Sequence, residues 1–465
     1  MRQIIPILVS LQADYKLAKL AINRAEGLWK ARKASPLRLQ PDAVETGGIE
    51  PASSSLQTNE TAEFTRGEIY AMIETMRTIS LFPFFLKAAA AALLVGGVFT
   101  SYGLDKPVAP PAFLHSAYLV GGRIRDRAEI DGIARAPFQL LYVVAEPNWA
   151  TADFDLPAEQ AIQRLVSAHV YSSPKGNVGN ALVPALIAQA HQRKMRVLLC
   201  VQGSARGDFA AVAASAARRA CFVRTLAAFV KKYDYDGIDI DWEQNVDCAN
   251  HVRLMADMRQ ALNAAAPKGR RYTLTTALQT YRAFSPEQAR QLCAAVDWIN
   301  LMTYDMGGGY WGHAATHNAP LDGMKAILTS KWSVFPPDKL CIGLAGYGYL
   351  YRGLAPGQPC SVPLRQKGRS IAYSELPKLL AAGWKEAYDP AAQMSYYFSP
   401  DRRDFATIDN PASIKRKMDW VLASRFRGVF WWEYHHDYLP PDRSNAAPRH
   451  PLIDAASGAL RAGGR

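Results

Sequence analysis

Residues 236 to 243 read Asp-Gly-Ile-Asp-Ile-Asp-Trp-Glu. Successive side chains of a β-strand point to opposite faces, so Asp239, Asp241 and Glu243 share one face of this octet. The opposite face is apolar throughout and consists of Ile238, Ile240 and Trp242. Three carboxylates in a row beside apolar residues are costly, because they repel one another and lose hydration on burial. The octet therefore predicts a catalytic strand in preference to an acidic surface strand or a three-carboxylate cation site.

Short apolar runs recur from about residue 115 to about residue 457, and helical stretches separate them. We predict eight strands: Ser116–Val120, Gln139–Ala145, Arg196–Val201, Gly237–Glu243, Tyr272–Leu278, Trp298–Tyr304, Leu340–Ala345 and Gly428–Glu433. Leu182–Arg193, Phe209–Lys232 and His251–Ala265 carry apolar residues at helical spacing. Eight strands that alternate with helices predict an α/β protein with a (β/α)8 TIM barrel. The acids end the fourth strand, and such barrels place active sites at the carboxyl ends of their strands.

The four acids of the octet, Asp236, Asp239, Asp241 and Glu243, fill the pattern Asp-x-x-Asp-x-Asp-x-Glu. This pattern resembles the signature of glycoside hydrolase family 18, the chitinase family. The resemblance covers nearly all of residues 115–457, with the other motifs in the family's order. It implies a TIM-barrel enzyme.

The later strands carry further motifs that resemble those of the family. The sixth ends in Met302-Thr303-Tyr304-Asp305, similar to Met-x-Tyr-Asp, and the segment His317 to Leu321, which includes Asn318, is typical of the following loop. The seventh strand and the residues after it, from Gly343 to Gly348, resemble Gly-x-Pro-x-Tyr-Gly. Tyr347 matches the tyrosine of this motif, and Ala345 stands where proline is usual. The eighth matches the strand that supplies a tryptophan to the floor of the sugar site, here Trp432.

Two segments add detail to the resemblance. The third strand departs from the family's Ser-x-Gly-Gly, because Cys200 replaces serine and Gln202 replaces the first glycine. A larger side chain at Gln202 is expected to reshape a sugar subsite. Residues 351–400, with a helix near Tyr373–Ala382 and a strand at Met394–Phe398, resemble the small α+β insertion that many members carry between strands seven and eight.

The spacing of the acids bears on mechanism. Asp241 and Glu243 lie two residues apart on one strand, so their Cα atoms are roughly 6–7 Å apart and both side chains project from one side. A conventional retaining glycosidase flanks the bond with two carboxyls about 5 Å apart, one of them a nucleophile. The family instead uses the 2-acetamido oxygen of the substrate as nucleophile, a recognised exception to the two-carboxylate scheme.

The resemblance assigns a role to each candidate residue. Glu243 is the general acid and then the base, Asp241 binds the acetamido N–H, and Asp239 shares a proton with Asp241. Tyr304 holds the acetamido oxygen, and Trp432 stacks under the sugar ring. The remaining substrate-binding candidates are Asp305, Met302, Tyr347, Asn318 and Gln202.

The mechanism requires an N-acetylated sugar. The leading prediction is therefore endo-acting hydrolysis of β-1,4-linked N-acetylglucosamine polymers such as chitin. A second interpretation is a peptidoglycan or N-glycan N-acetylglucosaminidase. A third is a non-catalytic chitin-binding lectin, although such relatives usually lack the acid that Glu243 supplies. The resemblance implies no metal or organic cofactor, and we expect a monomer.

The overall composition narrows the partners. The net charge is +13, but lysine and arginine are spread along the 465 residues without a basic run, so we expect no nucleic-acid partner. None of the six cysteines forms a Cys-x-x-Cys pair, and His435-His436-Asp437 lacks further clustered ligands, so we expect no metal site. For an exported chain, a disulfide among Cys200, Cys221 and Cys248 stays open.

The chain ends carry the remaining predictions. Residues 1–75 lack sustained periodicity and are expected to be disordered or an error of the gene start, with Met76 or Met72 as the true start. Residues 76–103 contain an apolar stretch, 79–99, which predicts export through a signal peptide or an uncleaved membrane anchor. Residues 104–114 are expected to be a linker, and residues 458–465 a tail.

Overall fold

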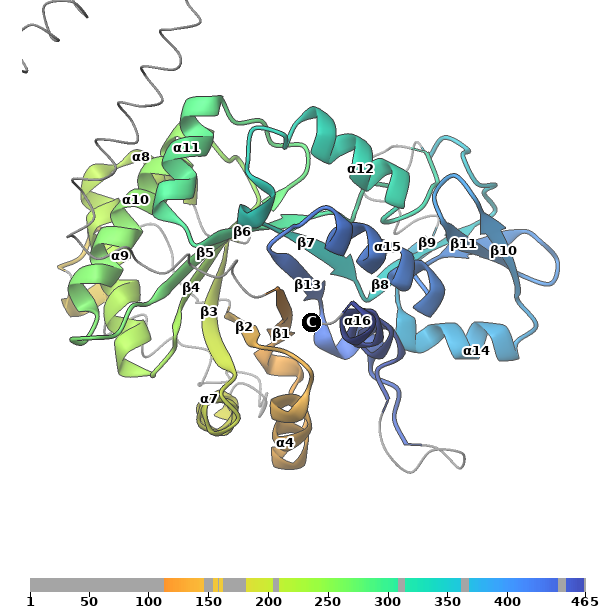
Figure 1. Cartoon of the computed structure of the whole chain (residues 1–465), viewed down its shortest axis with the longest axis horizontal. Coiled ribbons are helices and arrows are strands. Elements are labelled where there is room, and N and C mark those ends of the chain that lie inside the picture. The colour runs from red at the N-terminus through yellow and green to blue at the C-terminus, as the bar shows by residue number, and fades with distance from the viewer. Residues whose placement is uncertain are drawn as a thin grey trace, which may run out of the picture. The chain divides into compact units, whose positions relative to one another are not determined.

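The computed structural model describes residues 113–145, 154–157, 159–161, 181–203, 209–307, 314–360, 368–441 and 449–463. The predicted extension, leader and most of the linker fall on residues 1–112, outside this range. Eight parallel strands close a barrel in the order β1-β13-β7-β6-β5-β4-β3-β2 (Figure 1). Their bounds are β1 Leu114–Val120, β2 Leu140–Ala145, β3 Arg196–Gly203, β4 Gly237–Trp242, β5 Thr273–Gln279, β6 Trp298–Met302, β7 Leu340–Ala345 and β13 Gly428–Trp432. The predicted TIM barrel is confirmed, and each predicted strand end lies within two residues of the observed one.

Helices cover the outside of the barrel (Figure 1). They are α4 Arg127–Arg135, α7 Val183–Gln192, α8 Phe209–Ala214, α9 Ala216–Lys232, α10 Cys248–Ala265, α11 Pro286–Ala295, α12 Leu321–Ser330, α15 Pro411–Ala423 and α16 Pro451–Ala462. The helix predicted over Phe209–Lys232 is broken at Ser215, whose hydroxyl accepts the Arg218 N–H and begins α9. Such an N-cap satisfies a backbone donor that the helix itself cannot.

The predicted tail at 458–465 is wrong in its first part. Helix α16 continues to Ala462, because Leu452, Ile453, Ala456 and Ala459 recur at helical spacing and are all buried. None of the helices within the described ranges has the length and apolar character needed to cross a membrane.

Alternation along the strands separates two kinds of interior. Ile238, Ile240 and Trp242 of β4 pack in the apolar layer between barrel and helices. Asp239 and Asp241 point to the other side, into a barrel interior that holds Tyr118 and Tyr142. Both faces of β4 are buried, and the predicted division into an acidic and an apolar face agrees with the two sides to which its residues point.

All six cysteines carry free thiols. Cys200 lies in the barrel interior, whereas Cys221 on α9 packs in the outer apolar layer. The disulfide left open among Cys200, Cys221 and Cys248 is not formed, since all three are free thiols.

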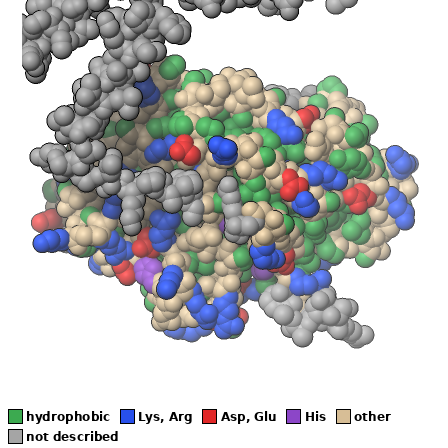
Figure 2. Space-filling view, viewed as in Figure 1, with side chains coloured by type: hydrophobic (Ala, Val, Ile, Leu, Met, Phe, Trp, Pro, Cys, Tyr) green, Lys and Arg blue, Asp and Glu red, His purple; other side chains and the backbone are tan. Residues whose placement is uncertain are grey.

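A second sheet follows β7 in the chain and precedes β13. It consists of β8 Tyr347–Arg352, β9 Gly368–Ala372, β10 Lys385–Asp389, β11 Met394–Phe398 and β12 Asp404–Thr407, in the antiparallel order β10-β11-β12-β8-β9. The short helices η4 Tyr373–Glu375 and α14 Leu376–Ala381 lie between β9 and β10. On the face drawn in Figure 2, basic side chains are scattered among acidic and apolar ones and form no continuous stripe.

Candidate active site

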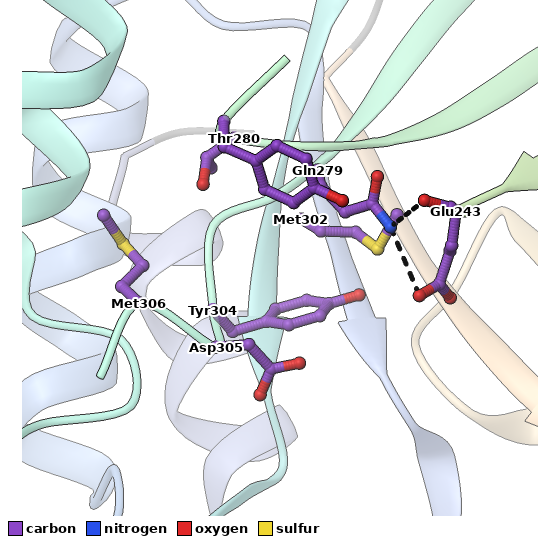
Figure 3. Close-up of a pocket in the computed structure, with 8 residues that line it drawn as sticks. Glu243, Gln279, Thr280, Met302, Tyr304, Asp305 and Met306 are labelled. Carbon is purple, nitrogen blue, oxygen red and sulfur yellow. Dashed lines mark hydrogen bonds between the residues drawn. The ribbon is translucent and has the colours of Figure 1, made fainter. Parts of the chain in front are cut away.

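Two cavities open at the carboxyl ends of the barrel strands, and Glu243 lines both of them. The smaller has a volume of about 90 Å³ and is lined by Tyr118, Asp241, Glu243, Ala277, Met302, Tyr304, Asp305, Tyr347 and Trp432. The larger has a volume of about 440 Å³ and is lined by Glu243, Gln279, Thr280, Tyr281, Met302, Tyr304, Asp305 and Met306 (Figure 3). The structure thus brings the predicted Asp241, Glu243, Tyr304, Trp432, Asp305, Met302 and Tyr347 together around one site.

Asp239 lies deepest and is fully buried. Its Oδ2 accepts a hydrogen bond from the Tyr118 hydroxyl (2.8 Å), and its Oδ1 accepts from the Thr275 hydroxyl (2.5 Å) and from the Asn300 amide (3.3 Å). Burial raises the pKa of Asp239 to about 6, although the hydrogen bonds of these donors and of the Cys200 thiol oppose the rise.

Asp241 has the opposite surroundings. Its Oδ1 is buried without a hydrogen-bond partner. Burial raises the pKa of Asp241 well above its usual range, and the charges of Glu243 and Asp239 act in the same direction. A buried acceptor without a partner is costly, so its presence at a cavity indicates a ligand donor that fills the gap.

The strand register explains why these two acids differ. The cross-strand neighbours of Asp239 are Cys200 on β3 and Thr275 on β5, and both can donate hydrogen bonds. The neighbours of Asp241 are Gln202 and Ala277. The methyl group of Ala277 offers no donor and leaves open space in the smaller cavity.

The expected proton sharing between Asp239 and Asp241 stays a prediction. Among the hydrogen bonds of the described residues, none joins these two carboxyls.

Glu243 follows the last residue of β4 and is half-buried. Gln279 Nε2 donates to its carboxylate Oε2 (3.3 Å) and to its backbone carbonyl (3.0 Å), as the dashed lines in Figure 3 show. Burial raises the pKa of Glu243, while hydrogen bonds from Gln202 and Gln279 oppose the rise. A carboxyl with a raised pKa at the boundary of two cavities is suited to give up a proton and take it back.

Tyr304 and its neighbours form the wall opposite Glu243. A Cβ atom at Gly343 would lie 2.7 Å from Cε1 of the Tyr304 ring, so only glycine admits the ring there. Tyr347 Oη donates to Asp305 Oδ1 (2.6 Å), and the Tyr349 hydroxyl donates to the same oxygen. Asp305 is therefore held in place by two phenols.

Asn318 supports this wall from behind. It is buried, its Oδ1 accepts the Asp305 backbone N–H (2.8 Å) and its Nδ2 donates to the Tyr347 carbonyl (2.9 Å). Asp305 has a φ of 55°, a left-handed conformation that few non-glycine residues adopt. Asn318, predicted to bind substrate, lines neither cavity and instead holds two residues that do.

The two tryptophans of β13 face opposite ways. Trp432 is half-buried and lines the smaller cavity, where its ring centroid lies 5.5 Å from that of Tyr118. Trp431 is buried in the outer layer, and its indole N–H donates to Nε2 of His115 (2.9 Å). The alternation predicted for this strand places the indole of Trp432, and not that of Trp431, at the site.

Several residues at the site were not predicted from the sequence. They are Tyr118, Thr275, Asn300, Gln279, Tyr281 and Arg282. Each lies on or just after β1, β5 or β6, far in sequence from the acids that it meets. Thr275 could have been found from its place opposite Asp239 in the strand register. That register is established only when the barrel closes.

The His435-His436-Asp437 segment has structural partners. Glu433 is buried and forms ion pairs with Arg123 (2.5 Å) and His435 (3.2 Å). Asp437 accepts the backbone N–H groups of Leu452 and Ile453 at the start of α16. The described residues contain no group of three or more His, Cys, Asp or Glu side chains that could hold a metal ion.

The fold and the site define a (β/α)8-barrel protein with a carboxylate cluster at the carboxyl ends of its strands. The family model of the glycosyl hydrolases family 18 matches residues 154–437, which is more than half of the chain. The chain therefore belongs to glycosyl hydrolases family 18.

Several chitinases are similar to this chain. Chitinase A1 of Niallia circulans is 28% identical over 270 residues, which are 49% of this chain and 38% of that protein. Endochitinase 1 of Metarhizium robertsii is 26% identical over 323 residues, 64% of this chain and 73% of that protein. The chain spans less than two thirds of the length of Chitinase A1 and of Chitinase 1 from Aphanocladium album, where the share is 63%.

Solved structures share the fold. A family 18 chitinase from Cycas revoluta in complex with allosamidin has a TM-score of 0.58 and 20% identity, with 75% of this chain and 99% of that chain covered. A family 18 N-acetylglucosaminidase from Paenibacillus barengoltzii has a TM-score of 0.55 and 22% identity, with coverages of 75% and 100%.

Proposed function

We propose that this chain hydrolyses β-1,4 bonds of N-acetylglucosamine polymers through substrate-assisted catalysis that retains the anomeric configuration. The observation that carries the proposal is the unpartnered, buried Oδ1 of Asp241 beside Glu243, Tyr304 and Trp432. A sugar with a 2-acetamido group supplies an N–H donor for that oxygen. A sugar with a hydroxyl in place of the 2-acetamido group would lack both this N–H and the acetamido carbonyl that the proposed chemistry needs.

The first step forms a ring on the substrate itself. The acetamido carbonyl oxygen bonds to the anomeric carbon while the glycosidic C–O bond breaks, and Glu243 gives its proton to the leaving oxygen. Asp241 accepts the acetamido N–H and stabilises the positive charge of the oxazolinium ring. The Tyr304 hydroxyl holds the acetamido oxygen, and Trp432 packs under the pyranose.

The second step consumes water. Glu243, now ionised, takes a proton from a water molecule whose oxygen bonds to the anomeric carbon. The bond between that carbon and the acetamido oxygen breaks, which restores the acetamido group and leaves Glu243 protonated. Two displacements at one carbon retain its configuration. Asp305 lines both cavities, but the two phenols on its Oδ1 favour a positioning role over that of a second nucleophile.

The test compares the wild-type chain with Glu243→Gln on chitin oligosaccharides and on purified peptidoglycan, with products read by mass spectrometry. We expect the wild type to cut the oligosaccharides and the variant to lose roughly 10²- to 10⁴-fold in rate, the usual contribution of a general acid. Binding of oligosaccharides to the variant should persist, because glutamine keeps the shape of the side chain.

The other outcomes separate the alternatives. Cleavage of peptidoglycan alone would keep the mechanism and assign the chain to cell-wall glycans. Binding of oligosaccharides without cleavage of either polymer would favour the lectin. Full activity of Glu243→Gln would contradict the role of Glu243. Such polymers lie outside the cell, which agrees with the export predicted from residues 76–103.

A further inference from the structure

Two side chains that follow β5 meet at Glu243. Gln279 is the last residue of β5, and Arg282 follows three residues later. Arg282 donates through one guanidinium nitrogen to the Glu243 backbone carbonyl (2.5 Å) and through Nε to Gln279 Oε1 (3.1 Å). Gln279 in turn donates to the Glu243 carbonyl and to its carboxylate (Figure 3). We call Gln279 and Arg282 the bracket.

The chemistry of arginine fixes which way the amide of Gln279 points. A guanidinium only donates hydrogen bonds, so the atom of Gln279 that faces Arg282 must be the carbonyl oxygen. The NH₂ group then faces Glu243. Arg282 therefore acts on Glu243 twice, directly at the backbone and indirectly through the orientation of Gln279.

The bracket also supplies hydrogen bonds to the backbone carbonyl of Glu243. Glu243 comes directly after the last residue of β4, so no further strand pairing holds its carbonyl. Two residues later Asn245 has a φ of 52°, and the chain turns away. Hydrogen bonds from Arg282 and Gln279 hold this carbonyl in place of a neighbouring strand, and they fix where the Glu243 side chain begins.

The same contacts bear on the charge of Glu243. An NH₂ donor stabilises the ionised carboxylate more than the neutral acid, so it favours loss of the proton. The proposed reaction needs both forms, the acid in the first step and the carboxylate in the second. Burial and the charge of Asp305 raise the pKa of Glu243, and the amide donors and the charge of Arg282 oppose the rise, so both forms stay accessible.

We propose that Gln279 and Arg282 are positioning residues that orient Glu243 and set the pH at which it titrates, with Arg282 acting in part through Gln279. This inference rests on the proposed function of Glu243. It adds two residues after β5 to the machinery and predicts that they act on the pH dependence of the rate, and not only on its size.

The experiment measures kcat/KM against pH on a chitin oligosaccharide for the wild type, Gln279→Met and Arg282→Met. Loss of a donor to the ionised form raises the pKa of Glu243, so the general acid stays protonated to higher pH. The basic limb of the profile should move upward by about one pH unit, the size set by one hydrogen bond to a charged group. Because Arg282 acts partly through Gln279, the double variant should shift by less than the two single shifts together.

Further variants test whether the effects arise only from loss of the folded structure. Arg282→Lys should rescue only part of the effect, since a lysine cannot reach two acceptors with the fixed fork of a guanidinium. Arg290→Met on α11 is the matched control, because Arg290 is exposed and pairs with Glu287 on the same helix. It should leave the profile unchanged. Thermal midpoints of all variants report whether the fold persists.

The outcomes distinguish the inference from the function on which it rests. An active wild type whose variants lose rate without any shift of the basic limb would overturn the inference and leave the proposed function intact. A downward shift would do the same. A wild type that cuts none of the substrates would overturn both.

Discussion

Asp239 provides a quantitative test of the electrostatics inside the barrel. It is a fully buried carboxyl that accepts hydrogen bonds from Tyr118, Thr275 and Asn300. Burial favours the neutral acid, whereas the hydrogen bonds favour the carboxylate. Burial has the larger effect and raises the pKa of Asp239 from 3.8 to about 6.

The raised pKa predicts how stability depends on pH. The folded protein holds the proton of Asp239 more tightly than the unfolded chain, so this stabilisation is fully present below about pH 3.8. It is lost as the pH rises through about 6. The difference between the two pKa values corresponds to about 3 kcal/mol in the free energy of unfolding.

The assay is urea unfolding of the wild type and of Asp239→Asn at several pH values between about 3.5 and 7. Asparagine removes the titration but keeps the size of the side chain. We expect the unfolding free energy of the wild type, relative to the variant, to fall by about 3 kcal/mol over this range. Loss of hydrogen bonds in the variant adds a constant that does not depend on pH and cancels in the comparison. Loss of the Asp239 charge also removes one cause of the raised pKa of Asp241, and this coupling is part of the measured difference.

The sign of the change in relative stability with pH shows whether burial or hydrogen bonding has the larger effect on the pKa of Asp239. A relative stability that stays flat, or that rises with pH, would show that the donors around Asp239 outweigh its burial. The environment inferred for the deepest acid would then be wrong, even with every contact in place.

Two further predictions concern the sugar site. Trp432→Ala should weaken binding of chitin oligosaccharides by roughly 10- to 100-fold, since a tryptophan that packs against a ligand contributes a large share of the binding energy. Trp384→Ala, which removes an indole that lines neither cavity, should have no effect, and equal affinities of the two variants would exclude Trp432 as the sugar platform. A thiazoline analogue of the oxazolinium ring should inhibit hydrolysis competitively, measured as a rise in KM at constant kcat. An active enzyme insensitive to the analogue would contradict substrate assistance.

The barrel could be predicted from the sequence because its strands are parallel and covered on both sides. Such strands read as short apolar runs, and the helices between them keep their own spacing of apolar residues. The exceptions were local. The break at Ser215 depends on a hydroxyl that caps α9, and the extension of α16 to Ala462 depends on packing against the rest of the fold.

The acids of the site were predictable, but most of their partners were not. Asp239, Asp241 and Glu243 lie within five residues, so strand alternation alone brings them together. Tyr118 and Asn300 are 121 and 61 residues away from Asp239. No local pattern predicts such contacts, because they require the barrel to close and each strand to take one register.

The register explains how one strand face can carry three acids in different environments. At Asp239 the neighbouring strands supply Cys200 and Thr275, so this carboxyl is surrounded by donors. At Asp241 one neighbour is Ala277, and an oxygen is left open to a ligand. Glu243 lies beyond the strand, where Gln202 and the bracket of Gln279 and Arg282 replace the missing sheet neighbours. The cost of burying the three acids is thus met differently at each of them. Hydrogen bonds hold Asp239, and in the proposed mechanism a ligand completes Asp241 while Glu243 exchanges a proton. A one-residue slip of either neighbouring strand would turn the opposite set of side chains toward the acids, and all three environments would be lost together.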